Sequence, residues 1–397
     1  MIVPTDGVPL DYLEDPDGID AWEAMKRARP PMSAEDRAAL EALEKRIRRP
    51  VAAGDPRRHH YIPEFFQKRF ATADEQVAVV PLRGDRYRLV HVSRVAVMRD
   101  LYTMIDVEIG ETVAVERLLA EVDGQAAGAI GRLTGGRFPP GPDDRATLAM
   151  WFALLGVRDP HSRRRMEALA DSVYKMDLAL VAHPDAARTR LRQNLGREPT
   201  AEEVGDLVDA ASDPGSFEVV PHQNAFIRQM LDSALAMFPH LLRRQYVIVR
   251  YPKPGLVFCD RPVILHQRPE NRDPLRGVGV INADEIWLPL GRDTALILHS
   301  DPIVGERVME APDGRSADDF NQAMVLNAIA EIYCHPDDVE RLADLQFPPA
   351  ERPLMTLTGG DWFSGTTDGI NDPPQRTRHR RYRREDPPDD HDPASEP

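Results

Sequence analysis

Four polar side chains stand at the ends of apolar segments, where a protein core can present a reactive group to a pocket. They are His60, Arg158, Asp260 and Asn321. His60 is a candidate acid or base, because an imidazole titrates near neutral pH and exchanges protons readily. The structural alternative is that the ring of His60 hydrogen-bonds the backbone and holds the turn around Pro63 in place.

Arg158 and Asp260 are candidates for holding an anion and for orienting a base. Arg158 follows an apolar helix and precedes Asp159 and Pro160. A guanidinium there could clamp a carboxylate or phosphate through two parallel bonds, or it could compensate the dipole of the preceding helix. Asp260 follows the apolar strand predicted over 256–259. A strand end holds a carboxylate rigidly, although aspartate in such a position also caps turns.

Asn321 is a polar residue on a helix predicted over 316–333, whose inward positions are otherwise mostly apolar. A buried asparagine needs hydrogen-bond partners, and these would be a ligand or the edges of neighbouring strands. We therefore treat His60 and Asp260 as candidate catalytic residues, and Arg158 and Asn321 as candidate binding residues.

The sequence lacks the spacings that mark common metal and cofactor sites. Four histidines could supply ligands, but no H-x-x-x-H, H-E-x-x-H or C-x-x-C spacing connects them; they are His59, His60, His266 and His299. Phosphate-binding loops, dinucleotide-binding glycine fingerprints, G-x-S-x-G and kinase signatures do not occur either. Cys259 is a weak nucleophile, because apolar neighbours raise the pKa of a thiol. We predict no metal site, and the sequence identifies no cofactor.

Composition and charge restrict the partners and the compartment of this 397-residue chain. Its formal net charge of −15 repels phosphate backbones and disfavours nucleic-acid binding. Its two cysteines, Cys259 and Cys334, suit a reduced cytosol. The N-terminus has no signal-peptide pattern, and no apolar run reaches the roughly 18 residues of a membrane span. We expect a soluble cytoplasmic protein that does not contact membranes, and its oligomeric state stays open.

Hydrophobic periodicity predicts an α+β fold, with a mostly helical body packed on a small, mainly antiparallel sheet. The predicted helices cover 33–48, 111–133, 144–157, 161–182, 222–243, 316–333 and 336–345, with a helical hairpin inserted at 183–220. The predicted strands of the sheet are 246–251, 256–259, 263–266, 286–290 and 294–299. A hairpin of strands 77–82 and 87–92 is expected to add to this sheet.

Proline-rich segments delimit the part of the chain that is expected to fold. We predict a leader over 1–56 that contains one helix, followed by a single α+β domain over 57–347. The remaining stretch, 348–397, is rich in proline, arginine and aspartate. Such a composition is typical of a largely disordered, solvated tail.

The start of the predicted domain resembles a bacterial family of uncharacterised proteins, catalogued as domain of unknown function 4238. The matching block is His60-Tyr61-x-Pro63-x-Phe65-x-x-x-x-Phe70. In the following helix, Glu116 and Asp123 stand near the family's two acidic positions, although the family tends to carry glutamate where Asp123 stands. Arg158 then precedes Pro160 with one residue between them, as in the family's Arg-x-Pro block.

The later blocks follow in the same order as in that family. Cys259-Asp260-Arg261-Pro262 resembles a Ser-Asp-x-Pro block, with Cys259 in place of the usual serine. Residues 286–290 resemble an apolar-Pro-Leu strand, and Asn321 with Tyr333 resembles the closing helix. The resemblance spans about residues 58–345. It implies an organisation and a candidate site but no reaction, because the family name records no activity.

Two functions from different classes fit these residues, provided that the four polar side chains converge in one cleft between the helices and the sheet. The first is a hydrolase-like enzyme acting on a phosphate-containing or anionic small substrate. His60 would be its general acid–base, Arg158 its anion clamp, and Asp260 an orienting carboxylate or metal ligand. The second is a non-catalytic ligand-sensing or interaction module. If the protein is the enzyme, His60 and Arg158 should line an open pocket. If it is the non-catalytic module, both side chains should be buried and paired with other protein groups.

Overall fold

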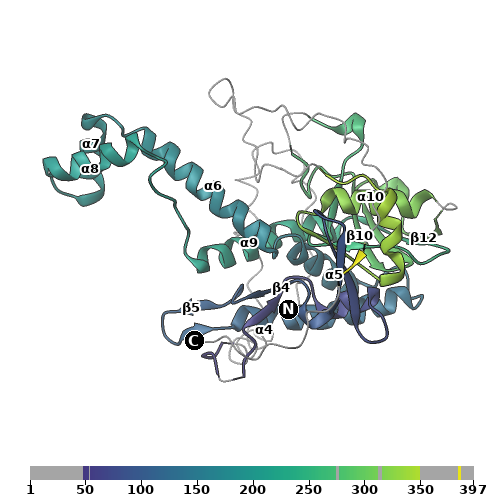
Figure 1. The fold of residues 1–397 in the computed structure, drawn as a ribbon. Coiled ribbons are helices and arrows are strands. Elements are labelled where there is room, and N and C mark those ends of the chain that lie inside the picture. The colour runs from purple at the N-terminus through teal and green to yellow at the C-terminus, as the bar shows by residue number, and fades with distance from the viewer. Residues whose placement is uncertain (1–47, 53, 274–276, 312–314, 349–382, 386–397) are drawn as a thin grey trace. The chain divides into compact units, whose positions relative to one another are not determined.

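The computed structural model describes residues 48–52, 54–273, 277–311, 315–348 and 383–385 (Figure 1). Its contacts divide the chain into two compact units, one of residues 1–57 and 102–121, the other of residues 58–101 and 122–397. The α+β prediction is confirmed, since helices alternate with several small, mostly antiparallel sheets. The helix predicted over 33–48, apart from Arg48, and most of the predicted tail lie outside the described residues. No described helix is long and apolar enough to cross a membrane.

The first unit contains an antiparallel hairpin and the start of a long helix. Its elements are β5 (Met104–Asp106), β6 (Gly110–Thr112) and the first turns of α4 (Ala114–Thr134). The carboxylate of Asp55 accepts a 2.8 Å hydrogen bond from Arg117 of α4. A backbone hydrogen bond and two arginine side chains, including that of Arg117, lower the pKa of Asp55 to about 2. These bonds connect the residues before 57 to α4.

In the second unit, one sheet has the strand order β12-β7-β11-β10-β9. Its strands are β7 (Gln245–Arg250), β9 (Ile264–His266), β10 (Glu285–Gly291), β11 (Thr294–His299) and β12 (Arg307–Glu310). Neighbouring strands are antiparallel, except for the parallel pair of β12 and β7. Four of these strands coincide with predicted ones, whereas the sequence pattern predicts no strand at β12.

Another sheet of this unit has the order β14-β3-β2-β13-β8. Its strands are β2 (Gln76–Pro81), β3 (Arg86–His91), β8 (Phe258–Cys259), β13 (Glu331–Cys334) and β14 (Arg383–Arg384). The sequence predicts a single sheet, and this is wrong: the hairpin of β2 and β3 shares a sheet with the predicted strand β8, but the other four predicted strands form a separate sheet. The reason is that β13 pairs with both β2 and β8, which draws β8 away from the strands that follow it in sequence.

The helix predicted over 316–333 is too long. Helix α10 covers Arg315–Asn327, and the chain then turns into β13. The backbone N–H groups of Ile329 and Ala330 bond to the carboxylate of Asp260 at 2.9 and 2.6 Å. Because this carboxylate replaces the carbonyl partners of another helical turn, the helix stops. The helix predicted over 336–345 is the 3-10 helix η6 (Pro336–Asp344).

The remaining helices of this unit surround an aromatic core. They are α3 (Glu64–Gln67) with the 3-10 turn η2 (Lys68–Phe70), α5 (Pro142–Leu155), α6 (Pro160–Ala179) and α9 (Gln223–Leu242). Every residue of α5 from Leu148 to Leu155 is buried, in keeping with a helix that is apolar on all sides. The rings of Phe66, Trp151 and Phe258 stack edge to face or tilted, at centroid distances of 5.3 to 5.9 Å. This core fixes the first turn after His60 against α5 and β8.

The helical hairpin predicted at 183–220 is confirmed as α7 (Pro184–Leu195) and α8 (Ala201–Ser212). Thr200 and Glu203 form the expected capping box at the start of α8. The hairpin packs on the end of α6 through a small apolar cluster of Leu178, Val181, Ala187, Val204 and Ala211. Short strands β1 (Arg58–His60) and β4 (Val97–Arg99) pair beside α3.

Candidate functional site

His60 lies at the end of β1, immediately before the turn that leads into α3. Its side chain is 20% exposed, and its Nε2 lies 3.4 Å from the carbonyl oxygen of Val92 and 3.5 Å from Glu64. Burial lowers the pKa of His60, because the charged imidazolium loses hydration. The ring therefore contacts backbone and a neighbouring carboxylate while keeping a small exposed surface.

Arg158 is fully buried and bonded to other parts of the protein. Its Nε donates to the carbonyl oxygen of Tyr61 at 3.0 Å, and its Nη1 lies 3.1 Å from Asp123. Trp151 Nε1 donates to the same carboxylate at 3.0 Å. Burial raises the pKa of Asp123, and the guanidinium of Arg158 opposes this rise. Arg158 thus neutralises an internal carboxylate at the position where the sequence resembled the family's second acidic residue.

Asp260 is 1% exposed and lies directly after β8. Its carboxylate accepts the backbone N–H groups of Ile329 and Ala330, as described above, and the more distant N–H of Glu331 at 3.4 Å. Its Oδ2 also lies 3.3 Å from Nε2 of His161. Asp260 therefore caps a turn and orients an imidazole, and that imidazole belongs to His161 instead of His60.

Asn321 is fully buried in α10 and bonds only the backbone in the contacts that the described chain provides. Its Oδ1 accepts the N–H of Val257 at 3.1 Å, and its Nδ2 donates to the carbonyl oxygen of Gly255 at 2.8 Å. The sequence left open a ligand or a strand edge as partner, and the partners here are backbone groups of the segment just before β8. Asn321 fixes the extended chain that leads into β8.

Tyr61 relates to three of the four predicted residues in different ways, by a hydrogen bond to Arg158, by chain adjacency to His60 and by the charge of Asp260. The carbonyl oxygen of Tyr61 binds Arg158, and Tyr61 directly follows His60. The phenol oxygen of Tyr61 lies 3.4 Å from that of Tyr333. Burial, and then the negative charge of Asp260, raise the pKa of Tyr61. Asn321 has no contact with Tyr61 among the described residues.

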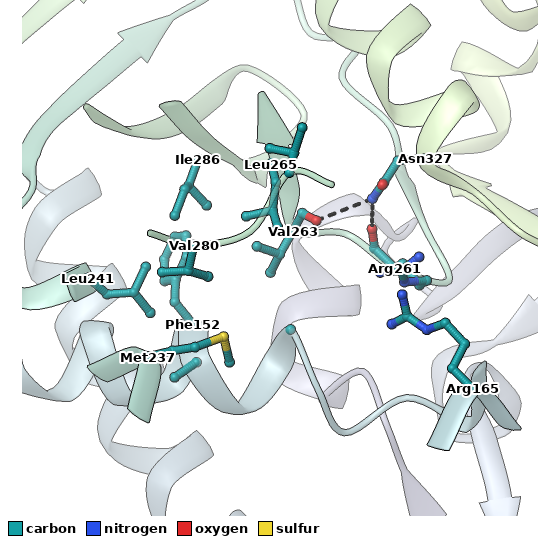
Figure 2. A pocket seen from close by; sticks show the side chains of 13 residues that line it. Phe152, Arg165, Met237, Leu241, Arg261, Val263, Leu265, Val280, Ile286 and Asn327 are labelled. Carbon is teal, nitrogen blue, oxygen red and sulfur yellow. Dashed lines mark hydrogen bonds between the residues drawn. The ribbon is translucent and has the colours of Figure 1, made fainter. Parts of the chain in front are cut away.

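A cavity of about 300 Å³ lies beside the predicted site and is lined by none of its four residues. Its walls come from α5, α6, α9, α10, β9 and β10 and from the loop before β10 (Figure 2). The lining residues are Phe152, Ala153, Gly156, Arg165, Met237, Leu241, Arg261, Val263, Leu265, Val278, Val280, Ile286 and Asn327. This cavity, formed by described residues, is therefore adjacent to the predicted site and not part of it.

Two arginines form the charged end of this cavity. Figure 2 shows the guanidinium groups of Arg165 and Arg261 next to each other, away from the aliphatic side chains. Burial and the positive charge of Arg261 lower the pKa of Arg165. Arg165 donates a 3.1 Å hydrogen bond to the hydroxyl of Ser162. Within the described part of the chain, neither guanidinium forms an ion pair with a carboxylate.

The start of α6 and the end of β8 place these arginines. The carboxylate of Asp159 caps α6 by accepting the backbone N–H groups of His161 and Ser162, both at 2.9 Å. His161 and Arg165 are four residues apart and share a helix face. Asp260 is bonded to His161, and Arg261 follows Asp260 in the chain. The pair of Asp260 and His161 therefore sets the distance between the two arginines.

Residues 58–338 match the family model described as "Protein of unknown function (DUF4238)". The chain belongs to the DUF4238 family. The match includes every residue of the cavity and all four predicted site residues of this DUF4238 protein. No curated protein and no solved structure gives a match.

Sequence reasoning missed His161, Arg165 and Arg261 in this DUF4238 protein, although a signal was present for two of them. Asp159 and Pro160 form a helix start, and a histidine and an arginine four residues apart follow it. Arg261 carries no comparable signal, because its role depends on α6 lying beside β8. Among the described residues, no group of three or more His, Cys, Asp or Glu side chains could hold a metal ion.

Proposed function

We propose that this protein binds a small anionic ligand between Arg165 and Arg261, as a ligand-sensing module. The observation that carries the proposal is the proximity of two guanidinium groups at one end of a cavity, neither of them in an ion pair with a carboxylate among the described residues, although the charge of Asp159 acts on Arg165. Two cations held together repel each other, and an anion between them removes that repulsion. A carboxylate or phosphate also matches the donor geometry of guanidinium groups.

Three of the four polar residues first considered, Arg158, Asn321 and Asp260, have contacts that favour a structural role over catalysis. Arg158 is sealed and paired with Asp123, and Asn321 is bonded to backbone. Asp260 caps a turn. These side chains support the fold, which leaves the cavity as the place for a ligand. We also propose a bacterial cytoplasm as the setting, because both cysteines are buried free thiols.

Phosphate titration monitored by thermal unfolding tests the proposal. A ligand that binds only the folded state stabilises it by about 2.7 kcal/mol when its concentration is one hundred times Kd. We expect millimolar inorganic phosphate to raise the Tm of the wild-type protein, and Arg165→Gln combined with Arg261→Gln to abolish this rise. Arg164→Gln, an exposed neighbour on α6, is the matched control and should keep it. Equal phosphate responses in the double variant and the control would remove the proposal.

The pair of His161 and Asp260 supports a second candidate, a hydrolase-like activity on an anionic substrate. A carboxylate bonded to one ring nitrogen orients an imidazole for proton transfer. Here the carboxylate lies on Nε2 of His161, and one helical turn later Arg165 reaches the cavity. In this candidate, His161 would be the general acid–base in place of His60, and Arg165 would be the anion clamp in place of Arg158.

Hydrolysis of bis(p-nitrophenyl) phosphate distinguishes this candidate from simple binding. An enzyme should release p-nitrophenol, and His161→Asn should reduce kcat by about 10² or more while keeping phosphate binding. His240→Asn, a half-buried histidine of α9 outside the cavity lining, controls for the loss of an imidazole. Absence of turnover by the wild-type protein on this and on monoester substrates would leave binding as the proposed function.

A further inference from the structure

We infer that the ligand is amphipathic, with an anionic head at Arg165 and Arg261 and an apolar group inside the cavity. This inference rests on the proposed function, because it assumes that the two arginines hold an anion. It adds the chemical class of the rest of the ligand. Its basis is the contrast between the two ends of the same cavity.

The end of the cavity opposite the arginines is lined by aliphatic and aromatic side chains. In Figure 2, Met237 and Leu241 of α9, Phe152 of α5 and Ile286 of β10 surround it. Phe152, Leu241 and Ile286 are at most 2% exposed, so their positions are fixed by the core. Met237 is half-buried, and its flexible thioether can adapt to the shape of an apolar group.

Among the described lining residues, no polar side chain with a free hydrogen-bonding group lies at this end of the cavity. Asn327 is the uncharged polar side chain among the described lining residues, and its Nδ2 donates to the backbone carbonyl oxygens of Arg261 and Val263. A sugar or a nucleobase placed there would lose hydration without gaining hydrogen bonds, which opposes its binding. The lining therefore disfavours nucleotides and favours hydrocarbon.

The size of the cavity limits the ligand to a short chain. Its volume of about 300 Å³ is at the low end of the range of about 300–1,000 Å³ for small-molecule sites. A head group and a short alkyl or aromatic group fit that description better than a long acyl chain. Each methylene that enters the cavity is expected to lower Kd about fourfold.

Isothermal titration of the full-length protein with two homologous series tests the inference. The series are linear carboxylates from acetate to decanoate and the corresponding monoalkyl phosphates, with inorganic phosphate and linear alcohols as references. We expect Kd to fall about fourfold per carbon and then to level off when the cavity is full. Arg165→Gln with Arg261→Gln should abolish binding throughout both series.

A second variant examines the apolar end on its own. Met237→Gln keeps the length of the side chain and adds an amide, so it should flatten the dependence of Kd on chain length while phosphate still binds. Met176→Gln, at an exposed position of α6, is the matched control and should leave the series unchanged. Circular dichroism and Tm of both variants verify that they are folded.

The outcomes separate this inference from the proposed function. Arginine-dependent binding whose strength is independent of chain length would overturn the amphipathic ligand and leave anion binding intact. Absence of binding by every anion, or equal binding of alcohols and anions, would overturn both. Vesicles that contain phosphatidylglycerol distinguish a lipid head group from a free amphiphile. If the protein binds vesicles but neither soluble series, the inference of a small ligand inside the cavity is wrong, and the arginines contact a membrane surface instead.

Discussion

Nε2 of His161 lies 3.3 Å from Oδ2 of Asp260, whose carboxylate also accepts the backbone N–H groups of Ile329 and Ala330. One buried carboxylate therefore connects the start of α6, the end of β8 and the turn between α10 and β13. The charged end of the cavity depends on this connection, because Arg165 belongs to α6 and Arg261 is the second residue after β8. The predictions below examine the bonds that hold these elements together.

Replacing Asp260 should destabilise the protein, because its carboxylate is buried and hydrogen-bonded. Asp260→Asn keeps the size of the side chain but presents an amide NH₂ to backbone donors, and it removes the partner of His161. Because the group is buried, we expect the free energy of unfolding to fall by about 3 kcal/mol. Urea denaturation measures this change. Asp206→Asn, on the exposed side of α8, should change it by less than about 0.5 kcal/mol.

The effects of replacing Arg158 and Asp123 on the free energy of unfolding should be strongly non-additive, because the two side chains form an ion pair. Arg158→Met leaves a buried carboxylate without its counter-ion and should cost about 3–5 kcal/mol of unfolding free energy. Adding Asp123→Leu removes that carboxylate, so the double variant should be more stable than additivity predicts, by at least about 1 kcal/mol. Chemical denaturation of the four proteins completes the cycle. Strict additivity would contradict the pairing seen at 3.1 Å.

The stability of the protein should rise with pH through the titration of His60. Burial lowers the pKa of His60 in the folded state below its ordinary value of 6.5, so the unfolded state binds its proton more tightly. The contribution of neutral His60 is complete above about pH 6.5 and is lost as the pH falls through the lowered pKa. His60→Gln should flatten this part of the curve of unfolding free energy against pH, measured by urea denaturation. His183→Gln, at an exposed position, should leave it unchanged.

Asn321 should matter for stability and not for ligand affinity. Asn321→Ala leaves the buried N–H of Val257 and the carbonyl oxygen of Gly255 without their partner. We expect a loss of about 2 kcal/mol in unfolding free energy. The Kd for phosphate should stay within twofold of wild type, because Asn321 does not line the cavity. Asn194→Ala, exposed on α7, is the control, and a large change in Kd for Asn321→Ala would return this residue to the binding site.

Apolar periodicity predicts the position of helices such as α5 and α9, which bury many of their residues, although it extends α10 too far. The same pattern does not predict which strands pair with one another in the sheets. Strand β13 pairs with β2, and the partners Ile332 and Val80 are far apart in the sequence. Period-two alternation indicates a strand but not its neighbour, so the sequence predicts one sheet where the structure has separate sheets for β8 and for the strands that follow it.

The site illustrates a related limit. For Arg158 the sequence leaves an anion clamp or a helix-dipole partner open, and for Asn321 it predicts a need for hydrogen-bond partners. Their partners are a carboxylate and the backbone of distant segments, and a sequence pattern does not distinguish these from a ligand. Arg165 appears as one of several arginines on α6 until the fold places it beside Arg261.

The carboxylate that ends α10 also implies a competition between two conformations of the same residues. The 3.6-residue periodicity from Phe320 to Ile332 continues through Ile329, so local preference extends the helix into what becomes β13. An isolated peptide of residues 315–334 would follow that local preference. In the whole protein, the carboxylate of Asp260, which lies 69 to 71 positions earlier in the sequence, binds the backbone at the start of β13 and favours the extended form. The conformation of β13, an interior strand that pairs with both β2 and β8, thus depends on contacts with distant parts of the sequence.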